Sequence, residues 1–233
     1  MKILYRLSDT GYKKVKAPYI NNENCLNNFI KNFLNNDTQD IIVLADNVCE
    51  NTYNMIKKHV PSSNIIKCSE GSGAQTFNIV LDMALKFNDN EIIYFLENDY
   101  IHRKNSKKIL EEGFNLGADF VCLYDHPDKY MNGSEGGNPF IENKGEYSQV
   151  FLSESCHWKL TNSTTMTFAT KVKILKQYEH IFRKWTTGTY PHDFQMFLEL
   201  RDNGCSLISP LPSYSTHGDL PWMAPLINWE KEI

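Results

Sequence analysis

Two carboxylates directly follow the most hydrophobic segment of the chain. The apolar run at residues 92–96 is typical of a buried strand, and Glu97-Asn98-Asp99 comes immediately after it. Residues two apart in an extended chain point to the same face, so we expect Glu97 and Asp99 to lie side by side. Such carboxylates repel each other unless a cation or a shared proton lies between them. The pattern therefore favours a divalent cation with oxygen ligands, Mg²⁺ or Mn²⁺, over two independent solvated turn acids.

The elements that must position these acids alternate between strand and helix. Continuous runs of Ile, Val and Leu separated by amphipathic helices are typical of a mainly parallel sheet covered on both faces. The expected strands are residues 2–7, 40–46, 64–68, 91–96 and 119–125, and the expected helices are 22–35, 50–58, 74–87 and 105–116.

Polar residues follow every one of these predicted strands. Ligands of parallel sheets bind at the carboxyl ends of the strands, so the coincidence predicts a site at one sheet edge. A single Asp or Asn there is also a common turn former. The segments are Arg6-Leu7-Ser8-Asp9, Asp46-Asn47, the stretch "SEGSGAQT" at 69–76, Glu97-Asn98-Asp99 and Asp125-His126.

The glycine-rich stretch "GSGAQ" at 71–75 precedes a predicted helix. Small residues let backbone amides approach an anion, and a helix N-terminus favours negative charge. The stretch matches neither the Walker loop nor the dinucleotide-binding glycine pattern, and a plain tight turn is the alternative.

The second half of the chain has a different character. Residues 126–165 form a long polar segment rich in Gly and Asn, which predicts a functional insertion or a partly mobile loop. A strand is expected at 164–170, and helices at 171–184 and 191–203. The tail at 209–233 has little periodicity. We expect one domain with an elaborated C-terminal half.

Composition limits the classes of function. The chain has 233 residues, 41% of them hydrophobic and 22% charged, with a net charge of −4. The one basic cluster, Lys13-Lys14-Val15-Lys16, is too short for a polybasic tail, so no nucleic-acid partner is expected. No apolar run reaches the roughly 18–20 residues of a transmembrane helix. Six cysteines without a CxxC pair, and no signal-peptide pattern, predict free thiols and a cytoplasmic protein.

Glu97-Asn98-Asp99 resembles the DxD motif of the GT-A-fold, nucleotide-sugar-dependent glycosyltransferases, with Glu in place of the first Asp. "RLSD" after the first strand and "LADN" after the second resemble the places where that family holds the nucleotide, in particular the enzymes encoded by large DNA viruses and some bacteria. The resemblance implies a Rossmann-like GT-A fold in one domain, with residues 1–125 as the nucleotide-binding half and 126–233 as the acceptor-side half. It implies metal ligation by Asp99 and Glu97. The implied nucleotide contacts are Arg6, Leu7, Ser8, Asp46, Ser72, Gly73, Gln75 and Asn98.

Two segments of the second half extend the resemblance. "TYPHDFQMF" places Asp193, after His192, where the family carries its catalytic base, although Asp also suits a helix N-cap. "SYSTHGD" places His217 as a third metal ligand, which would favour Mn²⁺ over Mg²⁺, unless it is an ordinary loop histidine. His157 and Trp158 are expected near the acceptor, where Trp158 would stack on a sugar; a core position is equally consistent with a Trp.

These residues imply metal-dependent transfer of a sugar from a nucleoside-diphosphate sugar, with UDP favoured, to a glycan or glycoconjugate hydroxyl. Inverting and retaining stereochemistry both stay open. The alternatives are a sugar-phosphate nucleotidyltransferase, which also needs a divalent metal, and a binding module of the same fold without turnover.

Overall fold

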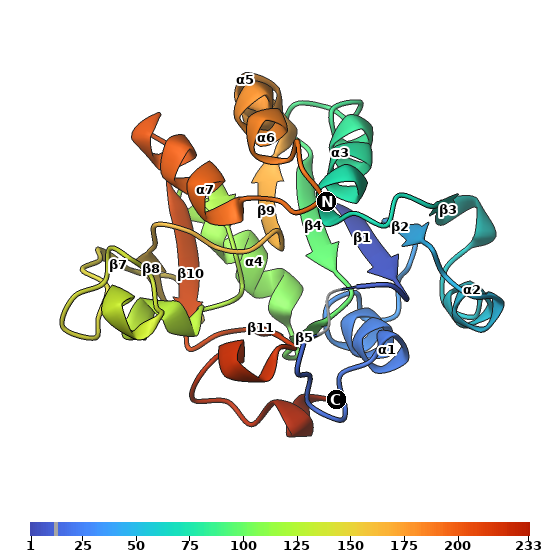
Figure 1. The fold of residues 1–233 in the computed structure, drawn as a ribbon, viewed down its shortest axis with the longest axis horizontal. Helices are drawn as coiled ribbons and strands as arrows, with labels where there is room; N and C mark the ends of the chain where they lie inside the picture. Colours follow the sequence, from blue (N-terminus) through green and yellow to red (C-terminus); the bar gives the residue numbers. More distant parts are fainter. Residues whose placement is uncertain (12–13) are drawn as a thin grey trace.

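A nine-stranded sheet forms the centre of the computed structural model, which describes residues 1–11 and 14–233 (Figure 1). Lys13 of the basic cluster lies outside these ranges. In spatial order the strands are β3 (Ile65–Cys68), β2 (Ile41–Asp46), β1 (Lys2–Ser8), β4 (Ile92–Glu97), β9 (Phe168–Lys171), β6 (Phe120–Val121), β10 (Leu207–Leu211), β8 (His157–Leu160) and β7 (Val150–Leu152).

The sheet is mixed, with one predominant strand direction. The neighbours β3, β2, β1 and β4 pair in parallel, as do β6 and β10. Among the described strands, β9 and β8 run against the others, each pairing antiparallel with both of its neighbours. The predicted α/β class with a mainly parallel core sheet is confirmed.

Alternating side chains divide the interior into two cores. On β4, Tyr94 and Leu96 point to one face of the sheet, whereas Ile93 and Phe95 point to the other. The first core packs against α1 (Asn22–Asn32), α2 (Glu50–Lys57) and α4 (Ser106–Asn115). The second packs against α3 (Gly73–Ala84), α5 (Val172–Gln177), α6 (Glu179–Trp185) and α7 (Asp193–Asp202). Because both faces are covered there, the central strands β1, β2 and β4 carry buried apolar side chains on both faces, as the sequence pattern indicates.

The second half is more regular than its sequence pattern predicts. β7 and β8 lie within the segment expected to be a long loop, and β10 and β11 (Ser215–His217) were not expected. β11 pairs antiparallel with β5 (Tyr100–His102), which follows the acids at the end of β4. The strand expected at 119–125 forms ladder pairs only over β6, and the helix expected at 171–184 is interrupted at Tyr178.

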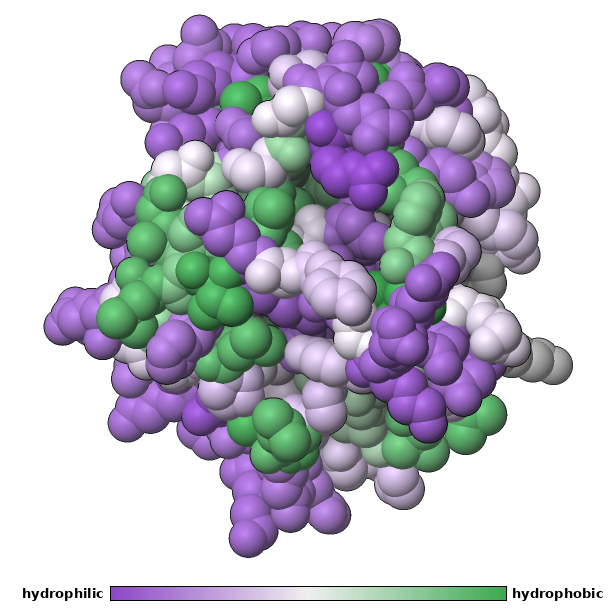
Figure 2. Space-filling model, turned by 90° about the vertical axis from the view of Figure 1, so that its left-hand side faces the viewer, coloured by the Kyte–Doolittle hydropathy of each residue, from purple (hydrophilic) through white to green (hydrophobic). Residues whose placement is uncertain are grey.

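The face carrying β7 and β8 exposes apolar side chains. Figure 2 views the molecule from this side and shows hydrophobic residues gathered on one part of it. Val150 and Leu152 are exposed on the edge strand, and Tyr147 is 91% exposed in the loop before it. No helix of the described residues is long and apolar enough to cross a membrane.

Gly113 of α4 lies so close to the sheet that we expect a larger side chain there to destabilise the protein. A Cβ there would lie 2.7 Å from a Val121 methyl carbon and 2.9 Å from the Trp158 ring. An exposed helical Gly→Ala change usually stabilises a protein by about 1 kcal/mol. We expect Gly113→Ala instead to lower the free energy of unfolding by about 1–3 kcal/mol, because the core is overpacked. Chemical denaturation measures this, with the exposed Asn115→Ala as the control; a stabilised Gly113→Ala variant would show that the packing is looser.

Candidate functional site

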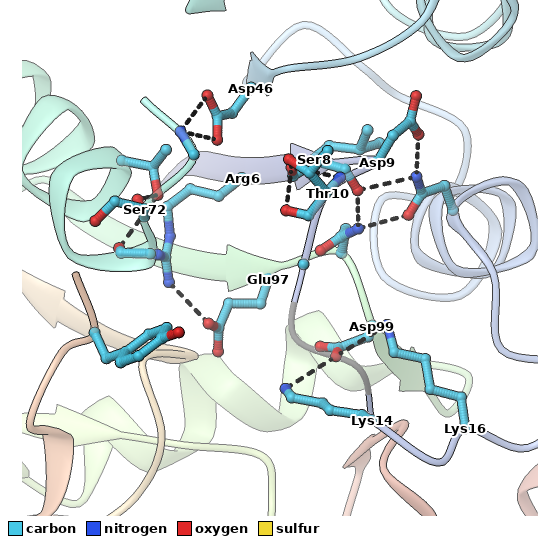
Figure 3. A pocket seen from close by; sticks show the side chains of 18 of the residues that line it. Arg6, Ser8, Asp9, Thr10, Lys14, Lys16, Asp46, Ser72, Glu97 and Asp99 are labelled. Atoms are coloured by element: carbon cyan, nitrogen blue, oxygen red, sulfur yellow. Dashed lines mark hydrogen bonds and ion pairs between the residues drawn. The ribbon is translucent and has the colours of Figure 1, made fainter. Parts of the chain in front are cut away.

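A cavity of about 590 Å³ opens at the carboxyl ends of β1, β2 and β4 (Figure 3). The N-terminal segment after β1, the turn before α3 and the segment before α7 complete its walls. Nine of the residues predicted from the sequence line it: Arg6, Leu7, Ser8, Asp46, Ser72, Gly73, Glu97, Asn98 and Asp99. The other predicted residues, Gln75, His157, Trp158, Asp193 and His217, are not part of its lining.

Arg6 and Glu97 form an ion pair at the floor of the cavity. The parallel register places Arg6 opposite Glu97, and both side chains emerge on the face covered by α3. The Arg6 Nη2 atom lies 3.3 Å from Glu97 Oε1, and Nη1 donates to the carbonyl of Gly73 at 3.0 Å. Arg6 is only 6% exposed. The pair therefore fixes one positive group beneath the start of α3.

The two acids that follow β4 point in different directions, contrary to our expectation. The strand ends at Glu97, and Asn98 and Asp99 form a turn, so the two-residue period of a strand does not apply to them. Glu97 is directed to Arg6, and Asp99 to the N-terminal segment (Figure 3). The Asn98 side-chain amide donates to the carbonyl of Ser8 at 3.1 Å and to Asn22 Oδ1 at 2.5 Å, which holds the turn.

Asp99 lies among three basic side chains. Its Oδ2 atom is 3.3 Å from the ammonium groups of both Lys14 and Lys16 and 3.4 Å from His217 Nε2. Burial alone would raise the pKa of Asp99, but the neighbouring His217, Lys14 and Lys16 hold it well below its usual range. The pairing of β11 with Tyr100 brings His217 to this position.

The predicted three-ligand metal centre is not assembled. Asp99 and His217 meet, but Glu97 is held by Arg6. The Lys14 ammonium contacts both of the other two predicted ligands, at 2.7 Å from His217 Nε2 and 3.3 Å from Asp99 Oδ2. Across residues 1–11 and 14–233, no group of three His, Cys, Asp or Glu side chains is arranged to hold a metal ion.

Asp46 holds the glycine-rich turn in place. Its Oδ1 atom accepts from the backbone N–H of Glu70 at 2.7 Å, and Oδ2 accepts from that of Gly71 at 3.1 Å. Gly71 has φ +62°, a conformation that a side chain disfavours. The Gly71 amide, expected to face an anion, is therefore directed to Asp46. Ser72 caps α3, accepting from the Gln75 N–H at 3.2 Å, and Gln75 itself is exposed outside the cavity.

The segment before α7 borders the cavity through Thr189 and Tyr190, and Asp193 follows it as the first residue of α7. Thr189 accepts hydrogen bonds from Ser72 Oγ at 2.7 Å and from the Ala74 N–H at 3.3 Å, so this segment is fixed on the start of α3. Asp193, the first residue of α7, is half-buried and accepts from the N–H of Phe194 at 2.7 Å. Burial raises the pKa of Asp193 to about 6, with a further contribution from the Glu97 carboxylate.

The two predicted acceptor residues lie apart from the cavity. Trp158 is fully buried in the core beneath α4, and its Nε1 atom donates to Ser153 Oγ at 3.0 Å. It has no free face on which a sugar could stack, so the structure corrects that expectation. His157 is exposed at the start of β8, opposite Leu211.

Eight residues of the cavity lining lie outside the strand-end segments that the sequence indicated: Thr10, Gly11, Lys14, Lys16, Asn21, Asn22, Thr189 and Tyr190. The short basic cluster was the only signal for the two lysines. It carried no information on which acid they meet, because 85 residues separate Lys14 from Asp99.

Comparison with known proteins gives structural matches alone. No protein-family model matches the sequence, and no curated protein is significantly similar to it. The structure of GalNAc-T7 with UDP, GalNAc and Mn²⁺ matches with a TM-score of 0.59 and 13% identity, covering 93% of this chain and 43% of that chain. A197 from STIV matches with a TM-score of 0.45 and 14% identity over 98% of this chain and 96% of A197. The galactosyltransferase LgtC, in complex with donor and acceptor sugar analogs, matches with a TM-score of 0.48 and 13% identity, covering 90% of this chain and 73% of LgtC.

The chain has the GT-A fold. It spans less than half the length of GalNAc-T7. At such identities the likeness shows the architecture, and the role of the cavity depends on the residues of this chain.

The raised pKa of Asp193 predicts how its removal changes stability with pH. An unfolded Asp ionises near pH 3.8 and Asp193 near 6, so the native state is destabilised as pH rises through this window. We expect Asp193→Asn to raise the free energy of unfolding by roughly 1–3 kcal/mol at pH 8 and to have little effect at pH 4. Urea denaturation at both values measures this. The exposed Asp202→Asn on the same helix is the control, and an equal change at the two pH values would contradict the prediction.

Proposed function

We propose that the chain transfers a sugar from a nucleoside-diphosphate sugar, with UDP favoured, to a hydroxyl of a glycan or glycoconjugate. The observation that carries this proposal is the cavity itself. It lies at the strand ends where α/β sheets bind ligands, its volume suits a small-molecule site, and basic groups line it beside an acid of raised pKa.

The donor would occupy the edge formed by β1, β2 and the start of α3. Leu7, Ser8 and Asp46 line the part assigned to the base and ribose, and Ser72 and Gly73 line the part nearer the diphosphate. Asp46 keeps the glycine turn in register, so its role toward a nucleotide includes holding that turn. Arg6 lies beneath the turn and supplies positive charge.

Asp193 is the proposed general base. In the transfer, the bond between the sugar C1 and the diphosphate oxygen breaks and its electron pair stays on the diphosphate. The acceptor oxygen forms the new bond to C1, and its proton passes to the Asp193 carboxylate. A carboxylate within hydrogen-bond reach contributes about 10²–10⁴-fold as a base, and a pKa near 6 leaves it ionised at neutral pH.

A nucleotide screen tests the donor class. Native-state binding raises stability by about 2.7 kcal/mol at a 100-fold excess of ligand over Kd. We expect UDP, or failing that GDP, to raise the melting temperature selectively. We also expect the corresponding sugar nucleotide to be consumed only when a hydroxyl acceptor is present.

The two alternative functions, nucleotidyltransferase and binding module, predict different experimental outcomes. Pyrophosphate release from a nucleoside triphosphate and a sugar 1-phosphate would show a nucleotidyltransferase. Tight nucleotide binding without turnover on any acceptor of a glycan panel would show a binding module. Either result would overturn the proposed transfer.

Once a donor and acceptor pair is identified, Asp193→Asn should lower kcat by about 10²–10⁴-fold and leave the Kd of the nucleotide nearly unchanged. The wild-type rate should fall as pH decreases through about 6, because the base becomes protonated. Asp202→Asn should match wild type in both measurements. A full rate in Asp193→Asn would remove this residue from the chemistry.

A further inference from the structure

The Lys14 ammonium lies where the fold family leads one to expect a metal ion. It is 3.3 Å from Asp99 Oδ2 and 2.7 Å from His217 Nε2, the two predicted metal ligands that the structure does bring together. Lys16 approaches the same carboxylate oxygen at 3.3 Å. A positive charge supplied by the chain therefore already bridges the donor atoms that a divalent ion would need.

The residues do not fit a divalent ion in this arrangement. Glu97 is paired with Arg6, so the ligand set loses one carboxylate. The two remaining predicted ligands, Asp99 and His217, both contact the Lys14 ammonium. A divalent ion placed between them would be repelled by this positive charge. The carboxylate and the imidazole are therefore free to hold an ion only when the Lys14 ammonium is removed.

Lys14 and Lys16 also face the space in which a diphosphate would lie. Both line the cavity together with Arg6, and their side chains keep 25% and 32% exposure, so they are accessible to a ligand. Asp99 also lines the cavity but is only 5% exposed. Figure 3 shows the Asp99 carboxylate beside the two lysines, and this pairing orients their ammonium groups.

We propose that Lys14, supported by Lys16, takes the place of the divalent cation, so that the chain binds the diphosphate of its donor without a metal. This inference rests on the proposed function. When the sugar C1–O bond breaks, the electron pair moves onto the diphosphate oxygen, and the ammonium groups stabilise that charge while keeping their protons. Asp99 and His217 are then positioning residues for Lys14.

Calorimetric titration of the full chain with UDP, in EDTA and in Mn²⁺, tests the proposal. We expect the Kd of wild type to agree within about threefold between the two conditions. Lys14→Met should weaken binding in EDTA at least tenfold, and Lys14→Arg, which keeps the charge, should retain most of it. Lys86→Met serves as the matched control, since Lys86 is exposed just beyond the far end of α3 and should bind as wild type does.

A second readout needs neither nucleotide nor activity. Electron paramagnetic resonance of added Mn²⁺ should show no bound ion on wild type. Bound Mn²⁺ on Lys14→Met would support the proposal, because Asp99 and His217 are then released from the ammonium. The test does not depend on the folding of a variant, because Mn²⁺ bound to the wild-type chain would by itself contradict the lysine proposal.

The outcomes separate this inference from the function on which it rests. Wild type that binds Mn²⁺ and needs it to bind UDP would overturn the lysine proposal and leave the glycosyltransferase proposal intact. Wild type that binds neither UDP nor GDP under either condition would overturn both.

Discussion

A buried carboxylate at the end of a central strand requires a cation, and Asp99 meets this requirement with groups from its own chain. An ionised acid that is 5% exposed would be strongly destabilised without a partner. Two ammonium groups and one imidazole lie within 3.4 Å of its Oδ2 atom. Each comes from a distant part of the sequence, so this single acid ties the N-terminal segment and the C-terminal β11 to the end of β4.

The rest of the cavity follows from strand register. Parallel pairing of β1 with β4 sets Arg6 beside Glu97, and parallel pairing of β1 with β2 ends with Ser8 beside Asp46. The two cores keep these strands rigid because each face of the sheet is covered by helices. A polar site of mixed charge is thereby held at the edge of a well-packed apolar scaffold, and Asp193 retains a raised pKa beside it.

The sequence predicted those features that depend on residues close together in the chain. Hydrophobic runs and helical periodicity located β1 to β4 and α1 to α4, and the strand-end rule identified nine residues of the cavity lining. It was uninformative where pairing is non-local. The strands β7 and β8 lie in a segment whose polar composition resembles that of a loop, and β8 pairs with the distant β10. The turn at Asn98 that separates the two acids depends on contacts with Ser8 and Asn22. Trp158 shows the same limit, since an aromatic suits a core and a sugar site equally well until burial is known.

The most direct test of a nucleotide site at this strand edge is a crystal structure of the chain grown with UDP and Mn²⁺, with anomalous data collected at the manganese edge. Our account predicts the nucleotide in the cavity, its diphosphate against Lys14 and Lys16, and no manganese peak beside Asp99. A diphosphate bound outside this cavity, or joined to Asp99 through a manganese ion with Lys14 turned away, would contradict it.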